Sequence, residues 1–315
     1  MKTAFVFSGQ GSQSIGMGLS LYNNFRVARD VFEEVDDALH ENLSDLMFRG
    51  DMAKLTQTQN AQPAIMAVGM AVVKTLEKEL GCRLTDKAAY MAGHSLGEYT
   101  ALCAAGAISL RDTAKLLQIR GLAMAWGSAI IYGGMMAVLG LPKEQIDVLI
   151  EQVSTSEEGA FIANDNCKGQ VIVSGDIRAL ARLRVEAEKI GARKVIPLSV
   201  DGAFHSPYMK PAADEMTGVI DKIALSSPRV PVISNVTAAP ETNPKKIKKN
   251  LLAQITGTVR WQESVEFMAC QGVDTFIECA NGKVMAGLIR RICPETTMLS
   301  VGDAETMSPV LELLK

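Results

Sequence analysis

A five-residue segment, Gly93-His94-Ser95-Leu96-Gly97, constrains the fold of this chain more than any other feature of the sequence. It matches the pattern G-x-S-x-G. A short apolar run over residues 88–92 precedes it, and a helical pattern follows from about residue 96. In this setting the serine occupies a sharp turn between strand and helix. Any side chain at the two glycine positions of this turn would collide with neighbouring backbone. The segment therefore predicts a nucleophilic Ser95 at a helix N-terminus. The alternative is a tight turn with a capping serine.

Strand-like and helix-like segments alternate through most of the chain, which predicts an α/β architecture with a mostly parallel sheet. Between residues 134 and 200 the expected order becomes strand, helix, strand, strand, helix, strand, the ferredoxin-like pattern. We therefore expect a hydrolase-like large domain over residues 1–126 and 200–315, with an inserted ferredoxin-like small domain over residues 127–199. The expected strands are 3–7, 88–92, 134–140, 160–165, 170–174, 193–200, 230–234, 273–278 and 297–301, and the expected helices are 60–80, 96–106, 109–126, 142–153 and 176–190.

Three histidines are available as a base for Ser95. His40 lies in a charged helical stretch, which indicates a solvated surface position. His94 is adjacent to the nucleophile, so its side chain should point away from the hydroxyl and line or pack the site. His205 lies in a loop between the last strand of the small domain and a new helix, where a base can reach such a serine. His205 is therefore the candidate base. An ordinary α/β-hydrolase places its histidine late in the chain, and about 110 residues follow His205 without another one.

Composition narrows the classes of function. The net charge of −3 gives no general basic field that would gather nucleic acid. No apolar run approaches the roughly 20 residues that cross a bilayer, and the N-terminal residues fit a strand better than a signal peptide. The six cysteines are scattered without a CxxC pair, which favours a reducing compartment. We therefore expect a cytoplasmic protein without nucleic-acid or membrane partners. The sequence shows no metal-ligand spacing, Walker A loop or dinucleotide fingerprint.

Several motifs resemble, in chain order, the malonyl-CoA:acyl-carrier-protein transacylase family, and together they cover essentially the whole chain. Phe204 before the histidine and Leu96 after the serine resemble the malonyl-selecting form rather than a methylmalonyl-selecting one. Ser8 departs from the pattern, where the family usually has proline, and so does the Cys-Ala-Asn-Gly-Lys run at 279–283, where Gly-Pro-Gly is common. The matching motifs are Phe7-Ser8-Gly9-Gln10-Gly11-Ser12-Gln13, Thr58-Gln59-Asn60-Ala61-Gln62-Pro63-Ala64, Gly93-His94-Ser95-Leu96-Gly97-Glu98-Tyr99, Ile119-Arg120-Gly121, Gly202-Ala203-Phe204-His205-Ser206, and Gln254 seven residues before Trp261.

The resemblance implies a ping-pong acyltransferase of fatty acid biosynthesis. Malonyl would pass from malonyl-CoA to Ser95, and then to the phosphopantetheine thiol of an acyl carrier protein. His205 would take and return the proton, oriented by a main-chain carbonyl near Gln254. The backbone N–H groups of Gln10 and Leu96 would form the oxyanion hole. No cofactor is implied beyond the coenzyme A thioester that serves as substrate.

The same resemblance gives Arg120 the role of a clamp for the malonyl carboxylate, through two parallel N–H···O bonds that lysine cannot supply. Without the resemblance, Arg120 fits a surface helix position. We expect four further residues in the substrate site: Gln62, His94, Phe204 and Asn164. Asn164 and Asn166 lie at expected strand ends and could line a cleft between the domains.

Other functions stay open at this point. A serine esterase or thioesterase would use the same nucleophile, and a malonyltransferase could serve polyketide synthesis. A catalytically silent carrier-binding protein is a third possibility. Four lysines at 245–249 could dock an acidic carrier protein, although we favour a solvated helix face. We expect a monomer.

Overall fold

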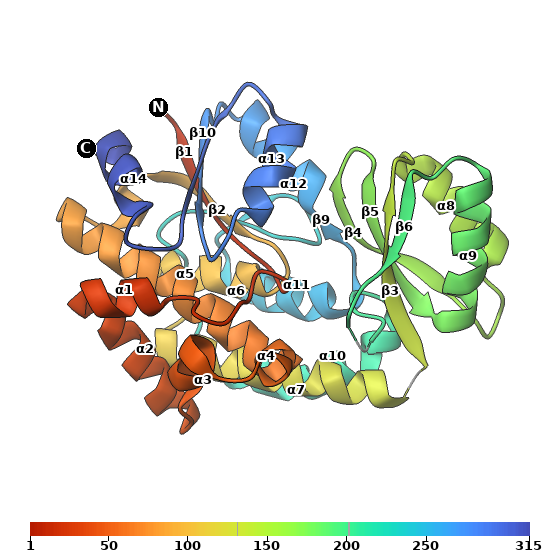
Figure 1. Cartoon of the computed structure of the whole chain (residues 1–315), viewed down its shortest axis with the longest axis horizontal. Helices are drawn as coiled ribbons and strands as arrows, with labels where there is room; N and C mark the ends of the chain where they lie inside the picture. Colours follow the sequence, from red (N-terminus) through yellow and green to blue (C-terminus); the bar gives the residue numbers. More distant parts are fainter. Residues whose placement is uncertain (131, 201) are drawn as a thin grey trace.

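Two β-sheets form the framework of this mixed α/β protein (Figure 1). The structure is a computed structural model that describes residues 1–130, 132–200 and 202–315. The first sheet has the strand order β11-β10-β1-β2-β7-β8, and all of its neighbouring strands are parallel except the pair β7 and β8. Its strands are β1 (Thr3–Phe7), β2 (Ala88–Gly93), β7 (Val232–Ile233), β8 (Pro240–Glu241), β10 (Thr275–Cys279) and β11 (Thr297–Val301).

The central strand β1 is buried at all five residues, as expected of a strand covered on both faces. Phe5 and Phe7 pack into a large apolar cluster with side chains of α2, α5, α6 and α7, whereas Ala4 and Val6 pack against α12 and α13. The sheet is thus a layer between two groups of helices. The helices outside the second sheet are α1 (Leu19–Asn24), α2 (Arg26–Leu39), α3 (Leu43–Arg49), α4 (Met52–Thr56), α5 (Thr58–Leu80), η1 (Leu84–Asp86), α6 (Leu96–Ala104), α7 (Leu110–Ile130), η2 (Pro207–Met209), α10 (Lys210–Lys222), α11 (Pro244–Thr256), α12 (Trp261–Cys270), α13 (Val284–Ile292) and α14 (Met307–Leu314).

The second sheet has the order β6-β3-β5-β4-β9, and its first four strands are antiparallel neighbours. Two helices from the same segment of the chain pack against it, while α12 and α13 contact its strand β4, and Figure 1 shows this group set apart from the first sheet. The elements are β3 (Gly133–Leu139), α8 (Lys143–Val153), β4 (Ala160–Cys167), β5 (Gln170–Asp176), α9 (Ile177–Lys189), β6 (Lys194–Pro197) and β9 (Val259–Arg260). Their order matches the expected order from β3 to β6. The fifth strand β9 pairs in parallel with β4 and comes from outside residues 127–199, so the domain boundaries stay a prediction.

Most expected elements are present, with informative differences at their ends. Gly81 ends α5 in the left-handed conformation, and the Asp176 carboxylate caps α9, both as expected. The strand expected over 193–200 ends at Pro197, and residues 198–200 instead line a cavity. β4 continues to Cys167, so Asn164 and Asn166 lie within a strand rather than at its end. None of the helices in the described ranges has the length and apolar character needed to cross a membrane.

Candidate active site

The turn between β2 and α6 holds Ser95 in the conformation that the sequence predicted. Its backbone has φ 54° and ψ −111°, an uncommon conformation for a residue with a side chain. A Cβ on Gly93 would lie 1.9 Å from the carbonyl group of Gly97, and a Cβ on Gly97 would lie 2.4 Å from the carbonyl oxygen of Phe7. Both glycines are therefore required by close backbone approach. The turn leaves the Ser95 hydroxyl at the start of α6, beside a cavity.

The Ser95 hydroxyl and the His205 imidazole are in hydrogen-bond contact. Oγ of Ser95 lies 2.8 Å from Nε2 of His205, although the two residues are 110 positions apart. The other ring nitrogen, Nδ1, lies 2.7 Å from the main-chain carbonyl oxygen of Gln254. A carbonyl can only accept, so Nδ1 carries the proton and Nε2 is free to accept one from Ser95. The orienting group is thus a carbonyl where many serine enzymes have a carboxylate.

Burial keeps the His205 imidazole neutral. The side chain is 5 % exposed, and this burial, reinforced by the positive charge of Arg120, lowers the pKa of His205 to about 3. At neutral pH the ring is therefore in the form that accepts a proton.

Arg120 lies fully buried on α7, with its guanidinium beside the Ser95 hydroxyl. Nη1 donates to Oε1 of Gln62 at 2.7 Å, and Nη2 donates to Oε1 of Gln254 at 2.9 Å. Nη2 also donates to Oγ of Ser95 at 3.1 Å. Among the described residues Arg120 forms no ion pair with an aspartate or glutamate, and its Nε has no hydrogen-bond partner. The surface position that the sequence alone suggested for Arg120 is wrong, because three long-range contacts draw the side chain into the interior.

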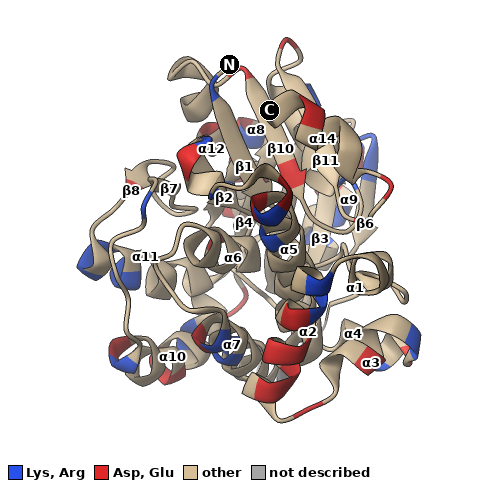
Figure 2. Cartoon of the chain, turned by 90° about the vertical axis from the view of Figure 1, so that its left-hand side faces the viewer, with Lys and Arg blue, Asp and Glu red and all other residues tan. Residues whose placement is uncertain are grey.

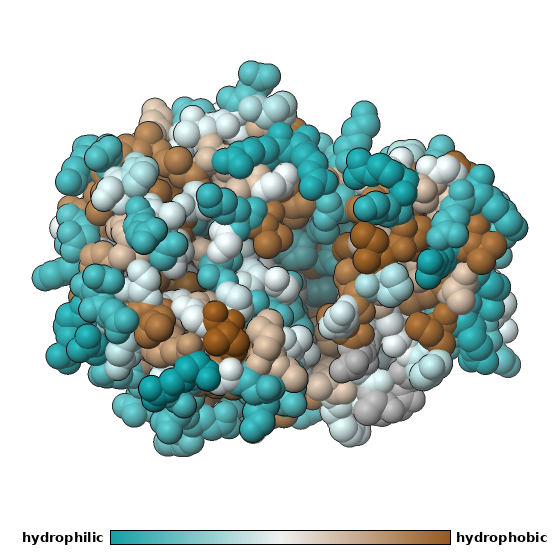
Figure 3. All heavy atoms as spheres, in the orientation of Figure 1, coloured by the Kyte–Doolittle hydropathy of each residue, from teal (hydrophilic) through white to brown (hydrophobic). Residues whose placement is uncertain are grey.

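A cavity of about 400 Å³ joins these groups. Figure 3 shows the hollow in the surface between the part that contains the first sheet and the part that contains the second. Apolar side chains, including Met52, Met124 and Leu198, form much of its wall. All the predicted site residues except Gln254 line it: Gln10, Gln62, His94, Ser95, Leu96, Arg120, Asn164, Phe204 and His205.

His94 lines this cavity without contacting the Ser95 hydroxyl. Its Nε2 lies 2.8 Å from Oδ1 of Asn166, and its ring centroid lies 5.7 Å from that of Trp261. Burial lowers the pKa of His94. The structure therefore assigns His94 a packing and lining position, and Asn166 fixes its ring. His40 is exposed at the end of α2, as expected.

Asn235 holds the nucleophile turn from the opposite side, and the sequence did not single it out for this role. Its Oδ1 accepts from the backbone N–H of Ser95 at 2.8 Å, and its Nδ2 donates to the carbonyl oxygen of Gly93 at 2.7 Å. The available signal was its position after the expected strand 230–234, next to the strand that ends at Gly93. Glu98 is a second such residue: it is 3 % exposed and contacts both Asn235 and Gln254.

We expect Asn235→Ala to destabilise the fold by about 2–4 kcal/mol, because it leaves the partly buried N–H of Ser95 and the buried carbonyl oxygen of Gly93 without a partner. The measurement is the free energy of unfolding in urea. Asn243→Ala is the matched control, since Asn243 only caps the exposed start of α11. A loss for Asn235→Ala no larger than for the control would contradict this role.

The lysines at 245–249 lie on α11, away from the mouth of the cavity. Figure 2 shows α11 on one side of the molecule, and α4 and β6 on the other. Met52 and Thr56 of α4, and Leu198 just after β6, line the cavity. Nζ of Lys248 also donates to the carbonyl oxygens of Asp221 and Ile223, at 2.9 Å each. This placement favours the solvated helix face over a docking patch.

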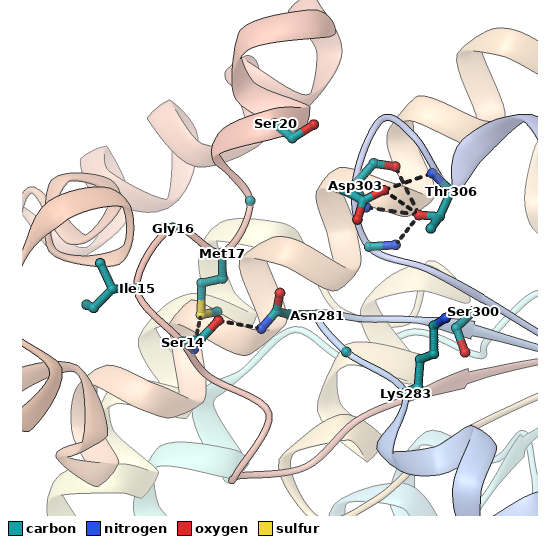
Figure 4. Close-up of a pocket in the computed structure, with 13 residues that line it drawn as sticks. Ser14, Ile15, Gly16, Met17, Ser20, Asn281, Lys283, Ser300, Asp303 and Thr306 are labelled. Atoms are coloured by element: carbon teal, nitrogen blue, oxygen red, sulfur yellow. Dashed lines mark hydrogen bonds between the residues drawn. The ribbon is translucent and has the colours of Figure 1, made fainter.

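A second cavity, of about 330 Å³, lies at the carboxyl ends of β10 and β11 (Figure 4). Its polar groups mainly satisfy one another: Asp303 accepts from Thr306, and Nδ2 of Asn281 donates to Oγ of Ser14 at 3.0 Å. Nδ2 of Asn281 also donates to the carbonyl oxygen of Ser12, so the unusual 279–283 run is tied to the loop after β1. We assign this cavity no ligand. Within the ranges that the structure describes, no group of three or more His, Cys, Asp or Glu side chains is placed to hold a metal ion.

Comparisons with known proteins all point to one family. Residues 4–305 match the family model described as an acyl transferase domain. The malonyl CoA-acyl carrier protein transacylase of Bacillus subtilis (strain 168) is 40% identical over 314 residues, which cover 100% of this chain and 98% of that protein. The crystal structure of an acyl-carrier-protein-S-malonyltransferase from Bartonella henselae superposes with a TM-score of 0.97 at 46% identity, covering 100% of this chain and 99% of that one. A malonyl-transacylase solved in complex with a type II PKS acyl-carrier protein gives a TM-score of 0.95 at 34% identity, over 99% of this chain and 100% of that chain.

Proposed function

The chain belongs to the malonyl CoA-acyl carrier protein transacylases, and we propose that it carries malonyl from malonyl-CoA to an acyl carrier protein through an ester on Ser95. The observation that carries the acyl choice is the environment of Arg120. A fully buried guanidinium lies 3.1 Å from the Ser95 hydroxyl and is held by two neutral amide oxygens, without a direct carboxylate partner among the residues that the structure describes. A buried cation in this state favours an anionic ligand, and an acyl group with a free carboxylate supplies one.

In the first half-reaction, Ser95 would attack the thioester carbonyl while Nε2 of His205 takes its proton. The Gln254 carbonyl holds the proton on Nδ1, so that the ring keeps the accepting nitrogen toward Ser95. We assign the oxyanion hole to the backbone N–H groups of Gln10 and Leu96, both on the cavity wall. The tetrahedral intermediate would then collapse, and His205 would return the proton to the departing coenzyme A thiolate.

In the second half-reaction, the phosphopantetheine thiol of the carrier would replace coenzyme A. The same base takes the thiol proton, and Ser95 leaves with the proton returned. Both donor and acceptor enter as slender thiol arms. The apolar wall formed by Met52, Met124 and Leu198 favours such an arm over water. The preference for a thiol arm over water as the acceptor would distinguish a transferase from the serine esterase or thioesterase that the sequence left open.

The test is the fate of malonyl from malonyl-CoA with and without a carrier protein bearing phosphopantetheine. With the carrier present, we expect rapid formation of malonyl-carrier. Without the carrier, we expect the release of coenzyme A to stop at about one equivalent per enzyme. Steady release of coenzyme A without a carrier would identify a hydrolase. Similar rates with carriers of fatty-acid and polyketide synthesis would mean that the enzyme can serve both pathways. A strong preference for one carrier would assign the enzyme to that pathway. We propose fatty acid biosynthesis, in line with the named relatives.

The pH dependence of acylation follows from the depressed pKa of His205. A histidine base of ordinary pKa loses activity as pH falls through about 6.5, because the ring becomes protonated. Since the pKa of His205 is lowered to about 3, the ring stays neutral well below that point. We expect kcat/KM for malonyl-CoA to show no acid limb that belongs to His205 between pH 8 and pH 5. We would measure kcat/KM in the Glu98→Gln variant, because Glu98 is a buried carboxylic acid whose own titration could produce an acid limb. A limb near pH 6.5 in that variant would contradict the assignment.

We also interpret the fold in the finer terms that the sequence suggested. The element order β3-α8-β4-β5-α9-β6 and the spatial order β6-β3-β5-β4 fit a ferredoxin-like unit, and the strand-turn-helix at Ser95 fits a hydrolase-like domain. Ser95 and Arg120 come from the first part, and Asn164 comes from the second, so substrate would bind where the two meet. The cytoplasmic location and the monomeric state stay predictions.

A further inference from the structure

A buried acid, Glu98, lies beneath the active site and has no part in the proposed chemistry. It follows Ser95 by three residues on α6 and is 3 % exposed. Its Oε2 accepts from the backbone N–H of Asn235 at 3.1 Å and from Nε2 of Gln254 at 2.7 Å. A carboxylic acid in such a position is costly unless its charge or its hydrogen bonds serve the fold or the site.

The side chain of Gln254 connects this acid to Arg120. Its Nε2 faces Glu98, and its Oε1 accepts from Nη2 of Arg120 at 2.9 Å. Nε2 also lies 3.0 Å from the carbonyl oxygen of Ser95. Glu98, Gln254 and Arg120 thus form a row of hydrogen-bonded side chains. All three are buried, so water does not complete their hydrogen bonds. The row therefore runs from carboxylate through amide to guanidinium, and it ends 3.1 Å from the nucleophile.

The two ends of the row fix the direction of the amide between them. An arginine side chain only donates hydrogen bonds, and an ionised carboxylate only accepts them. The amide of Gln254 must therefore present its oxygen to Arg120 and its nitrogen to Glu98. A half-turn of the amide would place donor against donor at one end and acceptor against acceptor at the other.

The row also separates two opposite charges by one neutral group. A carboxylate in direct contact with Arg120 would pair with the guanidinium and compete with any anionic acyl group. With Gln254 between them, Glu98 offsets the buried positive charge but leaves the guanidinium without a direct carboxylate partner in the described ranges of the chain. The separation is what allows an incoming carboxylate to be the direct partner.

We propose that Glu98 is a positioning residue that, through the side-chain amide of Gln254, sets the orientation and charge balance of Arg120 and thereby the preference for carboxylate-bearing acyl groups. This inference rests on the proposed function. It assigns to the Gln254 side chain a role distinct from that of its main-chain carbonyl, which orients His205.

The protonation of Glu98 agrees with this role. Burial raises the pKa of Glu98 to about 7, and the hydrogen bonds from Asn235 and Gln254 and the charge of Arg120 oppose that rise. The acid is therefore ionised above pH 7 and neutral below it. The other titratable groups around this row are Arg120 on α7, Tyr99 on the same helix as Glu98, and His205 before η2. Burial raises the pKa of Tyr99 to about 12, so Tyr99 is neutral throughout this range, as is His205.

The decisive variant exchanges the two groups, as Glu98→Gln with Gln254→Glu. The exchange keeps the composition and the number of donors and acceptors but puts the carboxylate against Arg120. The main-chain carbonyl that holds His205 is unchanged. We expect the preference for malonyl-CoA over acetyl-CoA, measured by competition as adducts on Ser95, to fall by at least roughly tenfold, while the acetyl adduct still forms. Glu278→Gln, which changes an equally buried glutamate bonded to Ser8 and to the start of α13, is the matched control and should keep the preference.

A single variant gives a second test if the exchanged protein does not fold. Glu98→Gln removes a negative charge near the bound carboxylate, so malonate should inhibit this variant roughly tenfold more strongly than the wild type at pH 8. The difference should shrink at pH 6.5, where the wild-type Glu98 is largely protonated. Equal inhibition at pH 8, or a difference that does not depend on pH, would overturn the proposal.

The outcomes separate the two proposals. If the wild type shows no preference for malonyl-CoA over acetyl-CoA, the result contradicts both the proposed function and this inference. A wild type that prefers malonyl, beside an exchanged variant that keeps this preference, overturns only the role of Glu98.

Discussion

Ser95→Ala is expected to lower the rate of malonyl transfer to a carrier protein by about 10⁵- to 10⁶-fold. The variant loses the oxygen that forms the covalent ester, and no second hydroxyl lies within hydrogen-bond distance of Nε2 of His205 among the described residues. The rate of malonyl-carrier formation under single-turnover conditions measures the effect. Alanine fits the space of serine, so the variant should fold like the wild type.

Ser264→Ala is the matched control for Ser95→Ala. Ser264 lies on α12 and is also buried, but its hydroxyl donates to the carbonyl oxygen of Arg260, outside the cavity. We expect it to keep most of the wild-type rate. A Ser95→Ala protein that retains about 1% of the rate or more would show that the acyl group passes through another residue or directly between thiols.

Arg120→Ala should abolish the preference for malonyl over acetyl groups, a change of about 2–5 kcal/mol in transition-state stabilisation. The guanidinium lies beside Ser95 with no carboxylate partner among the described residues, so its removal takes away the group that would bind the free acyl carboxylate. The measurement is competition between malonyl-CoA and acetyl-CoA for the same enzyme. It compares kcat/KM directly.

Arg120→Lys distinguishes geometry from charge. A lysine keeps the positive charge but cannot make two parallel bonds to one carboxylate, and it cannot reach both Gln62 and Gln254 in the same way. We expect it to recover only part of the preference. Unchanged discrimination in Arg120→Ala would remove Arg120 from acyl recognition.

The contact between Ser95 and His205 could be predicted because each residue has a signal in its own segment of the sequence. The pattern around Ser95 has close steric reasons, since Gly93 and Gly97 meet backbone within 2.5 Å of where a Cβ would lie. The scarcity of histidines then left His205 as the candidate base, and the structure places its ring 2.8 Å from Ser95. The resemblance to a known family supplied the carbonyl near Gln254, which the structure identifies as that of Gln254 itself.

The surroundings of Arg120 could not be predicted from local pattern. The helix that carries it is covered on several sides, so burial does not follow one clear apolar face. Its partners Gln62 and Gln254 lie 58 and 134 positions away in the sequence. Only folding brings these residues together, and the sequence pattern does not show that the described partners of the guanidinium are amides rather than acids.

Two very short strands carry other parts of the site. β7 lies within the expected strand 230–234, whereas β9 was not expected, because a strand of two residues is too short for any periodicity to appear. Asn235 follows the first of these strands and holds the turn of Ser95. The second joins the sheet that contains Asn164, through the pair of Asn164 and Val259. Such positions depend on the packing of the whole molecule.

The central claim is that Ser95 carries a malonyl ester during transfer. The most direct measurement is the mass of the intact protein after brief mixing with malonyl-CoA, beside acetyl-CoA and the Ser95→Ala variant. We predict a single malonyl adduct on the wild type, its absence from the variant, and its discharge when a carrier protein is added. A wild type that transfers malonyl without ever showing this adduct, or a variant that still acquires it, would contradict the account.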